Sequence, residues 1–187
     1  MDILSIFSAF GLSASAGLNA YIPLLIVSVV GRFAPDLIKL SEPWNIMTSW
    51  WIIGLLVVLS LIEFFADKIP AVDTINDVIQ TFVRPTAGAI LFAASAHVVT
   101  EVHPILSLGL GLLVAGGVHA VKTTARPVVT ATTLGTGNAI VSAAEDVAAT
   151  ALSVIAVTVP ILVAVVLILV SVIVLWRILR RTSTSRV

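Results

Sequence analysis

Long runs of apolar residues, separated by short polar connections, follow one another along the whole chain. A helix needs about 20 mainly apolar residues to cross the hydrocarbon core of a bilayer. The runs therefore predict about six transmembrane helices, over residues 4–31, 47–66, 84–101, 104–122, 138–157 and 159–179. Because no polar stretch is long enough for a soluble domain, we expect residues 1–187 to form a single all-α, polytopic helical bundle.

The segment after the second apolar run differs from the rest. It has a helical period, but it is too polar and too short to cross a membrane by itself. Asp67, Lys68, Asp73 and Asp77 lie in it, and Arg84 follows at the head of the third run. The pattern predicts a helix over residues 67–83 that is either re-entrant or interfacial, since irregular backbone at membrane depth must be covered by protein or water.

The first apolar run carries a ridge of small residues and a polar edge. Ala9, Ser13 and Gly17 recur at helical spacing, which favours close helix packing. Asn19 lies on the polar edge, and Pro23 can break or kink the helix. Trp44, Trp50 and Trp51 flank the second run and are interpreted as anchors at a membrane–water boundary.

The fifth run begins with a polar stripe. Asn138, Ser142, Asp146 and Thr150 recur at every fourth position, which places them on one face of a helix, and Glu145 flanks that face. Carboxylates in a membrane-length helix are costly, so they face a partner or a water-filled cavity. Two interpretations stay open. The acids are held by ion pairs with basic residues, or they bind a cation, a proton or a polar substrate.

Further candidates lie outside the fifth run. Asp73 and Asp77 are one helical turn apart and could hold Mg²⁺, although a solvated interfacial face explains them equally well. His97, His103 and His119 are scattered and are interpreted as packing or interface residues. We assign no catalytic residue and no metal ligand. The candidate substrate- or ion-binding residues are Glu145, Asp146, Asn138, Ser142, Asn19, Asp73, Asp77, Asp67, Lys68, Arg84 and Arg126.

Basic residues predict the orientation in the membrane. The tail over residues 177–187 is strongly basic and is expected to stay in the cytoplasm. Counting back through six spans places the N-terminus and the segments 67–83 and 122–137 on that same side. Only Arg32 and Lys39 then fall on the other side. We therefore expect a multi-pass protein of the inner or plasma membrane with both termini in the cytoplasm.

Composition agrees with a membrane protein. The chain is 59% hydrophobic and 11% charged, and its mean hydropathy is +1.15; soluble domains are about 25% charged. The formal net charge is zero, so nucleic acid is not expected as a partner. There is no cysteine, which excludes disulfides and thiol chemistry. Membrane lipid is the expected partner, with a homo-oligomer or a larger membrane complex as further alternatives.

Two polar segments share a pattern. Residues 73–81 read Asp-x-x-Asn-Asp-Val-x-x-Thr, and residues 142–150 read Ser-x-x-Glu-Asp-Val-x-x-Thr. Transporters often arise by duplication, with polar motifs at corresponding positions of the two halves. An internal repeat and chance similarity both remain open.

Four blocks in order resemble a known family. They are Gly17-x-Asn19-Ala20-x-x-Pro23, Asp67-Lys68-Ile69-Pro70-x-x-Asp73, Arg84-Pro85-x-x-Gly88 and Asn138-x-x-x-Ser142-x-x-Glu145-Asp146. They look like the recurring blocks of domain of unknown function 4126, a family of small, mainly bacterial integral membrane proteins. The resemblance implies the fold and the membrane location and supplies no substrate. Asn19 stands where members often carry a basic residue, so the resemblance assigns that position no role.

Three functions are compatible with these features. The first is a small transporter or channel for a cation, a proton-coupled solute or another small polar solute, with an intramembrane acidic site. The second is a structural or assembly subunit of a membrane complex. The third is an enzyme that uses Mg²⁺ to act on a lipid-linked phosphate. We expect no enzyme activity and no resident cofactor, with Mg²⁺ or another cation as the exception.

Overall fold

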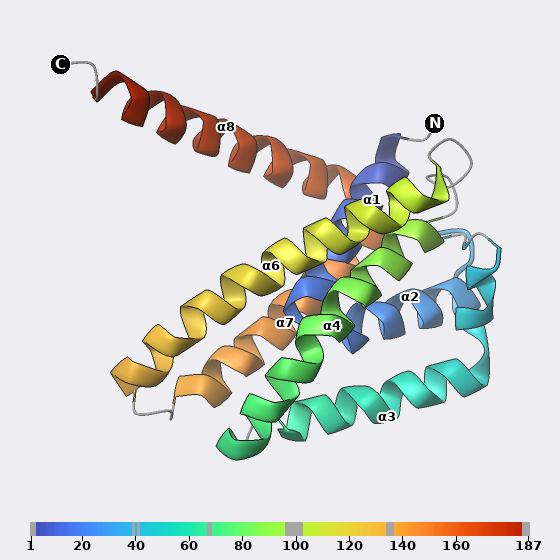
Figure 1. Cartoon of the computed structure of the whole chain (residues 1–187). Helices are drawn as coiled ribbons and strands as arrows, with labels where there is room; N and C mark the ends of the chain where they lie inside the picture. The colour runs from blue at the N-terminus through green and yellow to red at the C-terminus, as the bar shows by residue number, and fades with distance from the viewer. Residues whose placement is uncertain are drawn as a thin grey trace.

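The computed structural model describes residues 3–38, 40, 42–66, 69–95, 103–133 and 137–184. These ranges contain seven α-helices and one short 3₁₀-helix, η1. In chain order the elements are α1 (Ile3–Leu18), α2 (Tyr21–Phe33), η1 (Trp44–Thr48), α3 (Trp50–Ala66), α4 (Pro70–Ala94), α6 (Pro104–Thr133), α7 (Gly137–Thr158) and α8 (Pro160–Thr184), as Figure 1 shows.

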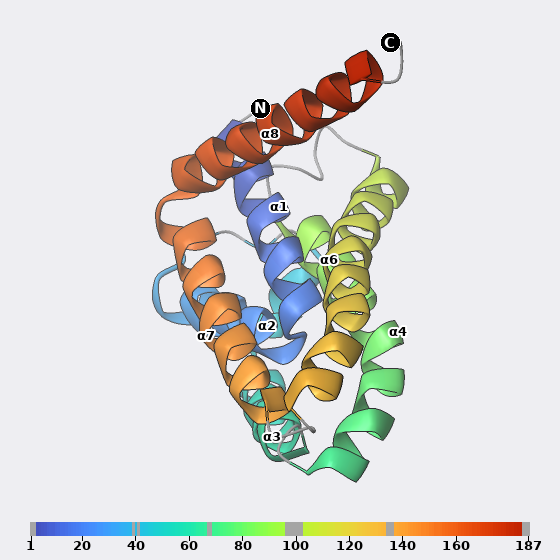
Figure 2. The ribbon, with the colours of Figure 1, turned by 90° about the vertical axis from the view of Figure 1, so that its left-hand side faces the viewer.

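Helix α1 lies at the centre of the bundle, with α4, α6 and α7 packed around it (Figure 2). Ala9, Leu12 and Ala16 are completely buried. Small side chains let neighbouring backbones come close, as the ridge in the sequence predicted. The Ser13 hydroxyl donates to the carbonyl of Gly88, at 2.9 Å. A serine buried among apolar residues can thus satisfy its own polar group and still pack closely.

The first two helices, α1 and α2, are joined at a break inside the bundle. Ser8 donates to the carbonyl of Ala156 (2.6 Å) and Asn19 to the carboxylate of Asp146 (2.9 Å), so α1 runs antiparallel to α7. After α2, Leu40 forms an isolated bridge with Ser95, next to the end of α4. The chain therefore enters along α1, turns inside the bundle and leaves along α2 at the same end. The expected single span over residues 4–31 is wrong, because the helix breaks at Asn19 and Ala20.

Helix α4 corrects a second expectation. The described part of the polar segment, from Pro70, is continuous with the third apolar run in one 25-residue helix. Pro85 lies inside this helix and removes one backbone hydrogen bond. A separate re-entrant or interfacial helix over 67–83 is therefore wrong. Asp67 and Lys68 lie outside the described residues, as do residues 96–101 of the expected span 84–101.

The expected placement of the segment 122–137 on the same side as the N-terminus also needs correction. Helix α6 extends to Thr133, so Lys122 and Arg126 lie within a helix and not in a connection. The contacts of α1 with α7 place the start of α1 at the end of the bundle opposite the start of α7. The start of α1 and residues 122–133, which contact the start of α7, thus lie at opposite ends of the bundle. Helix α8 begins at the same end as α1 and runs away from the bundle (Figures 1 and 2).

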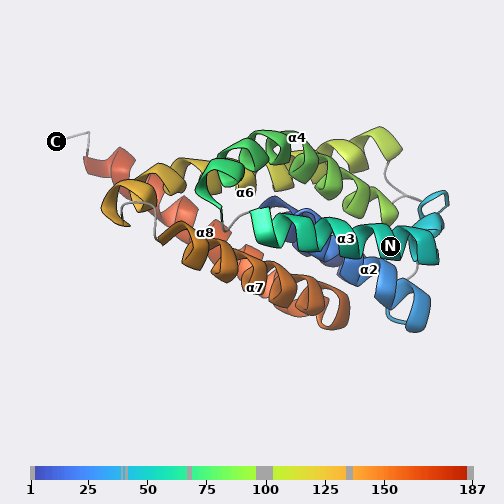
Figure 3. The ribbon, with the colours of Figure 1, turned by 90° about the horizontal axis from the view of Figure 1, so that it is seen from below.

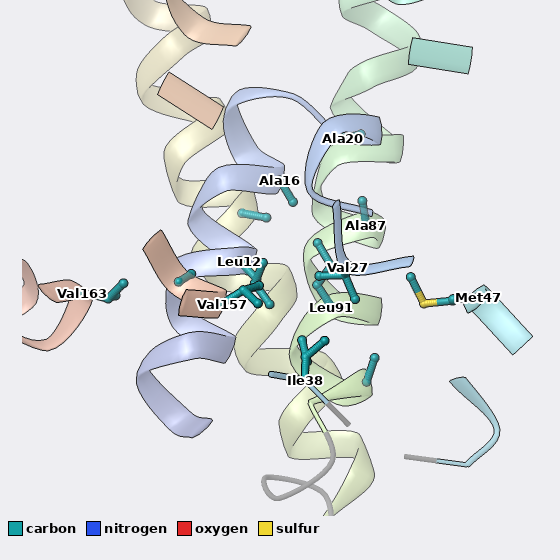
Figure 4. Packing of buried hydrophobic residues seen from close by; sticks show 13 residues of the cluster. Leu12, Ala16, Ala20, Val27, Ile38, Met47, Ala87, Leu91, Val157 and Val163 are labelled. Atoms are coloured by element: carbon teal, nitrogen blue, oxygen red, sulfur yellow. The ribbon is translucent and has the colours of Figure 1, made fainter. Parts of the chain in front are cut away.

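The hydrophobic core lies where α1, α2, α4 and α7 meet. Leu12, Val27, Leu91 and Val157 point toward one another there (Figure 4). The outer faces of the helices are also apolar, since Trp51 is 91% exposed and Phe82 is 74% exposed. Among the described residues, α6 and α7 are the two helices long and apolar enough to cross a membrane; the core helices of soluble proteins can pass the same test.

Helices α4 and α6 lie side by side (Figure 3), and the contact between them depends on glycine. A methyl group added at Gly88 would collide with the side chain of Ala115, whereas one added at Gly117 would meet nothing within 4 Å. We expect Gly88→Ala to lower the thermal unfolding temperature in detergent, because the helix backbones must separate, at a cost of about 1–3 kcal/mol. The matched change Gly117→Ala is expected to leave it unchanged or raise it, because alanine is the better helix former. Equal effects of the two changes would contradict this contact.

Candidate functional site

The break between α1 and α2 lies in the interior of the bundle. Asn19 is 3% exposed, and its Oδ1 accepts hydrogen bonds from the backbone N–H groups of Tyr21 and Ile22, both at 3.0 Å. This is the geometry of a side chain that caps the start of a helix. The Asn19 Nδ2 donates to Oδ1 of Asp146 on α7, at 2.9 Å. One amide thus joins the start of α2 to the polar stripe of α7.

The other side of the break is the last turn of α1. The Leu18 carbonyl accepts a hydrogen bond from Nζ of Lys122, at 3.2 Å. A helix presents partial negative charge at its C-terminus and partial positive charge at its N-terminus. Lys122 therefore lies at the negative end of α1, and Asp146 lies near the positive end of α2. The two charges and the two helix ends stabilise one another.

Glu145 and Arg126 extend this cluster toward α4. The Glu145 carboxylate lies 2.7 Å from Lys122 Nζ and 3.6 Å from a guanidinium nitrogen of Arg126. Arg126 donates to Ser142 at 2.8 Å and forms an ion pair with Asp77 at 2.6 Å. Its guanidinium thus connects α4, α6 and α7. Buried charges normally occur in such compensated groups, because a lone charge in a low dielectric is costly.

A second buried group lies further along α4. Arg84 is completely buried and donates to Glu63 on α3 at 3.0 Å; Glu63 is 1% exposed. The Arg84 guanidinium also lies 3.3 Å from Nδ1 of His119, and Nε2 of His119 lies 3.2 Å from the Thr81 hydroxyl. Arginine has only donors, so Nδ1 must accept. The neutral imidazole then carries its proton on Nε2 and donates it to Thr81.

Sequence periodicity explains why these groups meet. The buried positions of α6 recur every three or four residues along one face: Ser107, Gly111, Ala115, His119, Lys122 and Arg126. The facing positions of α4 are Asp77, Thr81, Arg84 and Gly88. The two stripes run antiparallel, so their polar halves meet at one end and their small residues meet at the other.

A groove opens onto this polar half. It has a volume of about 590 Å³, which is within the range of small-molecule sites. Its rim includes Asn138, whose side-chain oxygen accepts a hydrogen bond from Thr130 at 3.1 Å. Asp77 and Arg126 are shared between the groove and the buried cluster. The groove residues are Asp77, Val78, Thr81, Thr123, Arg126, Pro127, Thr130, Ala131 and Asn138.

The structure brings most of the candidate residues together. Glu145, Asp146, Ser142, Asn19, Asp77 and Arg126 form one cluster, and Asn138 lies at the edge of the adjacent groove. Arg84 belongs to the second group, with Glu63. The side chain of Asp73, and all of Asp67 and Lys68, lie outside the described residues. Among the described residues, no group of three histidine or acidic side chains could hold a metal ion.

Three members of the network, Glu63, His119 and Lys122, were not among the candidate binding residues. Glu63 interrupts an otherwise apolar run, and that isolation was the signal that could have identified it. His119 was interpreted as a packing residue. Its spacing of three and seven residues from Lys122 and Arg126 places all three on one helix face, which could have shown that it belongs with them.

Comparison with known proteins bears on the family and on nothing further. No curated protein and no solved structure matches the chain. A family model does match, and it covers residues 6–181, which is nearly the whole chain. The chain therefore belongs to the family described as Domain of unknown function (DUF4126).

Proposed function

We propose that the protein is an integral membrane protein in which α3, α4, α6 and α7 cross the bilayer. Helices α1 and α2 would enter it as a re-entrant pair. The lengths and composition of α6 and α7 support this placement. The exposed apolar residues of α3 and α8 support it too, because soluble proteins rarely expose apolar patches of this extent. Polar backbone at the α1–α2 break would be tolerated at membrane depth, since surrounding helices cover it.

Within this membrane protein, the proposed function is the transport of a small cation or small polar solute. One observation carries the proposal: a broken helix ends at a buried group of charges. Helix ends exposed by a break at membrane depth are a recurring design of transporter binding sites. Here Asn19, Lys122 and Asp146 lie at the break, and the groove next to Arg126 supplies an approach from one side.

The ion pairs suggest how the protein would respond when a cation or a proton binds at Glu145. A cation or a proton that binds Glu145 competes with Lys122 for the same carboxylate. Lys122 also holds the Leu18 carbonyl at the tip of the re-entrant pair. Weakening the Lys122–Glu145 pair would therefore loosen the tip of α1 from α6. Binding and movement of the re-entrant pair would be coupled through this one ammonium group.

The test is solute flux in proteoliposomes. A panel of cations and polar solutes is first screened with the wild type by solid-supported-membrane electrophysiology. Glu145→Gln and Asp146→Asn are expected to abolish the currents that the wild type gives, because they remove the charges at the break. Asp36→Asn is the matched control, since Asp36 is an exposed turn residue outside the cluster. Flux that survives both cluster substitutions, for every solute moved, would rule the proposal out.

An assembly subunit is the second candidate function. One observation favours it: Glu145 and Asp77 each pair with a cationic side chain of the same chain, as structural ion pairs do. In that case Glu145→Gln would lower the unfolding temperature and the recovery of a larger complex without removing any flux. The Mg²⁺-dependent enzyme has less support, because Asp77 is already paired with Arg126 and is not available as a metal ligand.

A further inference from the structure

A shallow apolar groove lies on α3, and none of its lining residues belongs to the charged cluster. It has a volume of about 620 Å³ and is lined by Trp50, Trp51, Gly54, Leu55 and Val58. Residues 50, 54 and 58 are spaced by four, so they follow one face of the helix. A methyl group added at Gly54 would meet nothing within 4 Å. The missing side chain at Gly54 therefore makes the depression between the tryptophans and Val58.

A fixed arginine lies at the tryptophan end of this groove. The Arg32 guanidinium stacks over the Trp50 ring, with Cζ 4.3 Å from the ring centroid, and its Nη1 donates to the Thr48 carbonyl at 2.9 Å. Phe33 packs edge-on against the same ring, with centroids 5.8 Å apart. Arg32 is nevertheless exposed. Two contacts hold the guanidinium in place and leave most of its N–H groups directed to the surroundings.

We propose that this surface is a binding site for one glycerophospholipid. The phosphate would lie on Arg32, and one acyl chain would lie in the groove along Gly54. Guanidinium and phosphate form strong, charge-assisted hydrogen bonds. Tryptophans occupy the level of the headgroups in membrane proteins. Arg32, the tryptophans and the apolar groove thus follow one another in the same order as the phosphate, the headgroup region and the acyl chain of a phospholipid.

Neighbouring charges are compatible with a phosphate at this position. The connection after α2 also carries Asp36 and Glu42. Glu42 accepts a hydrogen bond from the Asn45 amide at 2.5 Å, which engages part of its carboxylate. Arg180 stacks on Trp176 at 4.1 Å in α8 and forms a similar cation–aromatic pair, but Trp176 is not part of this groove. Arg180, which is also exposed, supplies a control for the loss of one arginine outside this groove.

The inference rests on the proposed membrane placement but not on transport. The test uses purified full-length protein in mild detergent, in which Trp44 and Trp176 are replaced by Phe, so that Trp50 and Trp51 report alone. The probe is phosphatidylglycerol brominated on its acyl chains, which quenches nearby tryptophan. Diacylglycerol with the same brominated chains tests the role of the phosphate. Flotation of the protein with vesicles tests the membrane placement separately.

Saturable quenching by the phospholipid is expected, with an apparent affinity about tenfold lower in Arg32→Gln, because one charge-assisted contact is lost. Gly54→Leu places a side chain in the groove, where its Cβ would meet nothing within 4 Å, and it is expected to remove the saturable component. Arg180→Gln is measured in the same background and is expected to behave as the parent protein does. Equal affinities for Arg32→Gln and the parent, or for diacylglycerol and the phospholipid, would overturn the site even if the protein floats with vesicles. Failure to float would overturn the membrane placement and the site with it.

Discussion

Replacing Arg84 by methionine is expected to lower the free energy of unfolding by about 3–5 kcal/mol, the usual effect of removing one partner of a buried ion pair. Arg84 and Glu63 are 0% and 1% exposed, so water cannot replace the lost guanidinium. The change is expected to appear as a large drop in the thermal unfolding temperature in detergent. The exposed Arg32, replaced in the same way, serves as the control for loss of an arginine.

A double variant separates the ion pair from simple packing. Arg84→Met combined with Glu63→Met leaves no buried charge and keeps long side chains at both positions, so it is expected to recover most of the lost stability. In the unmodified protein this pair attaches the end of α3 to α4. A double variant no more stable than Arg84→Met alone would show that the arginine acts through shape and not through its charge.

The second large effect is expected at Arg126. Arg126→Met removes one guanidinium from Asp77, Ser142 and Glu145 together, so two carboxylates on different helices lose a cation. The Asp77 side chain is 23% exposed and Glu145 retains Lys122, so the expected cost is smaller than at Arg84, about 2–3 kcal/mol. Thermal unfolding in detergent measures it.

Neutralising the acids in the same background tests the cause. Asp77→Asn added to Arg126→Met removes a carboxylate that has lost its cation, and stability is expected to rise again. Asp36→Asn added to the same parent is expected to change nothing, because Asp36 is an exposed turn residue outside the cluster. If both additions have the same effect, the ion pair between α4 and α6 does not contribute to stability.

The polar network joins α1, α4, α6 and α7 in the charged half of the bundle. Lys122 contacts a carboxylate on α7 and a backbone carbonyl on α1, and Arg126 contacts groups on α4 and α7. A buried polar network in which the groups have partners holds its helices in a fixed arrangement. Under the proposed transport, any movement of the re-entrant pair would have to break the hydrogen bond between Lys122 and the Leu18 carbonyl.

Much of this architecture could be read from periodicity. The apolar runs predicted the all-α bundle and α3, α6 and α7, because burial and membrane exposure both select apolar residues on every face of a helix. The four-residue spacing of Asn138, Ser142 and Asp146 predicted their common face. The carboxylates of Glu145 and Asp146 were recognised as residues that need partners, because the cost of an isolated charge in an apolar helix does not depend on the fold.

Helix breaks and junctions could not be read in the same way. Residues 4–31 look like one span, and the break falls at Asn19 and Ala20 rather than at Pro23, which lies in the first turn of α2, where proline is tolerated. Arg84 and Pro85 looked like the start of a helix, yet α4 continues through them. In both places contacts with α6 and α7 outweigh local preference. The internal repeat stays a prediction.

The sequence by itself determined which residues are too apolar for water and which charges are too costly to stand alone, since both follow from the free energy of transferring single side chains. Only the tertiary structure decided the pairing: Lys122 and Arg126 with Glu145, Arg126 with Asp77, Arg84 with Glu63, and Asn19 with Asp146. Pair choice depends on which helices become neighbours and in which direction they run. The neighbouring helices and their directions are fixed by the fit of small residues along α1, α4 and α6. These residues are far apart in the sequence, so a local pattern does not reveal which of them will meet.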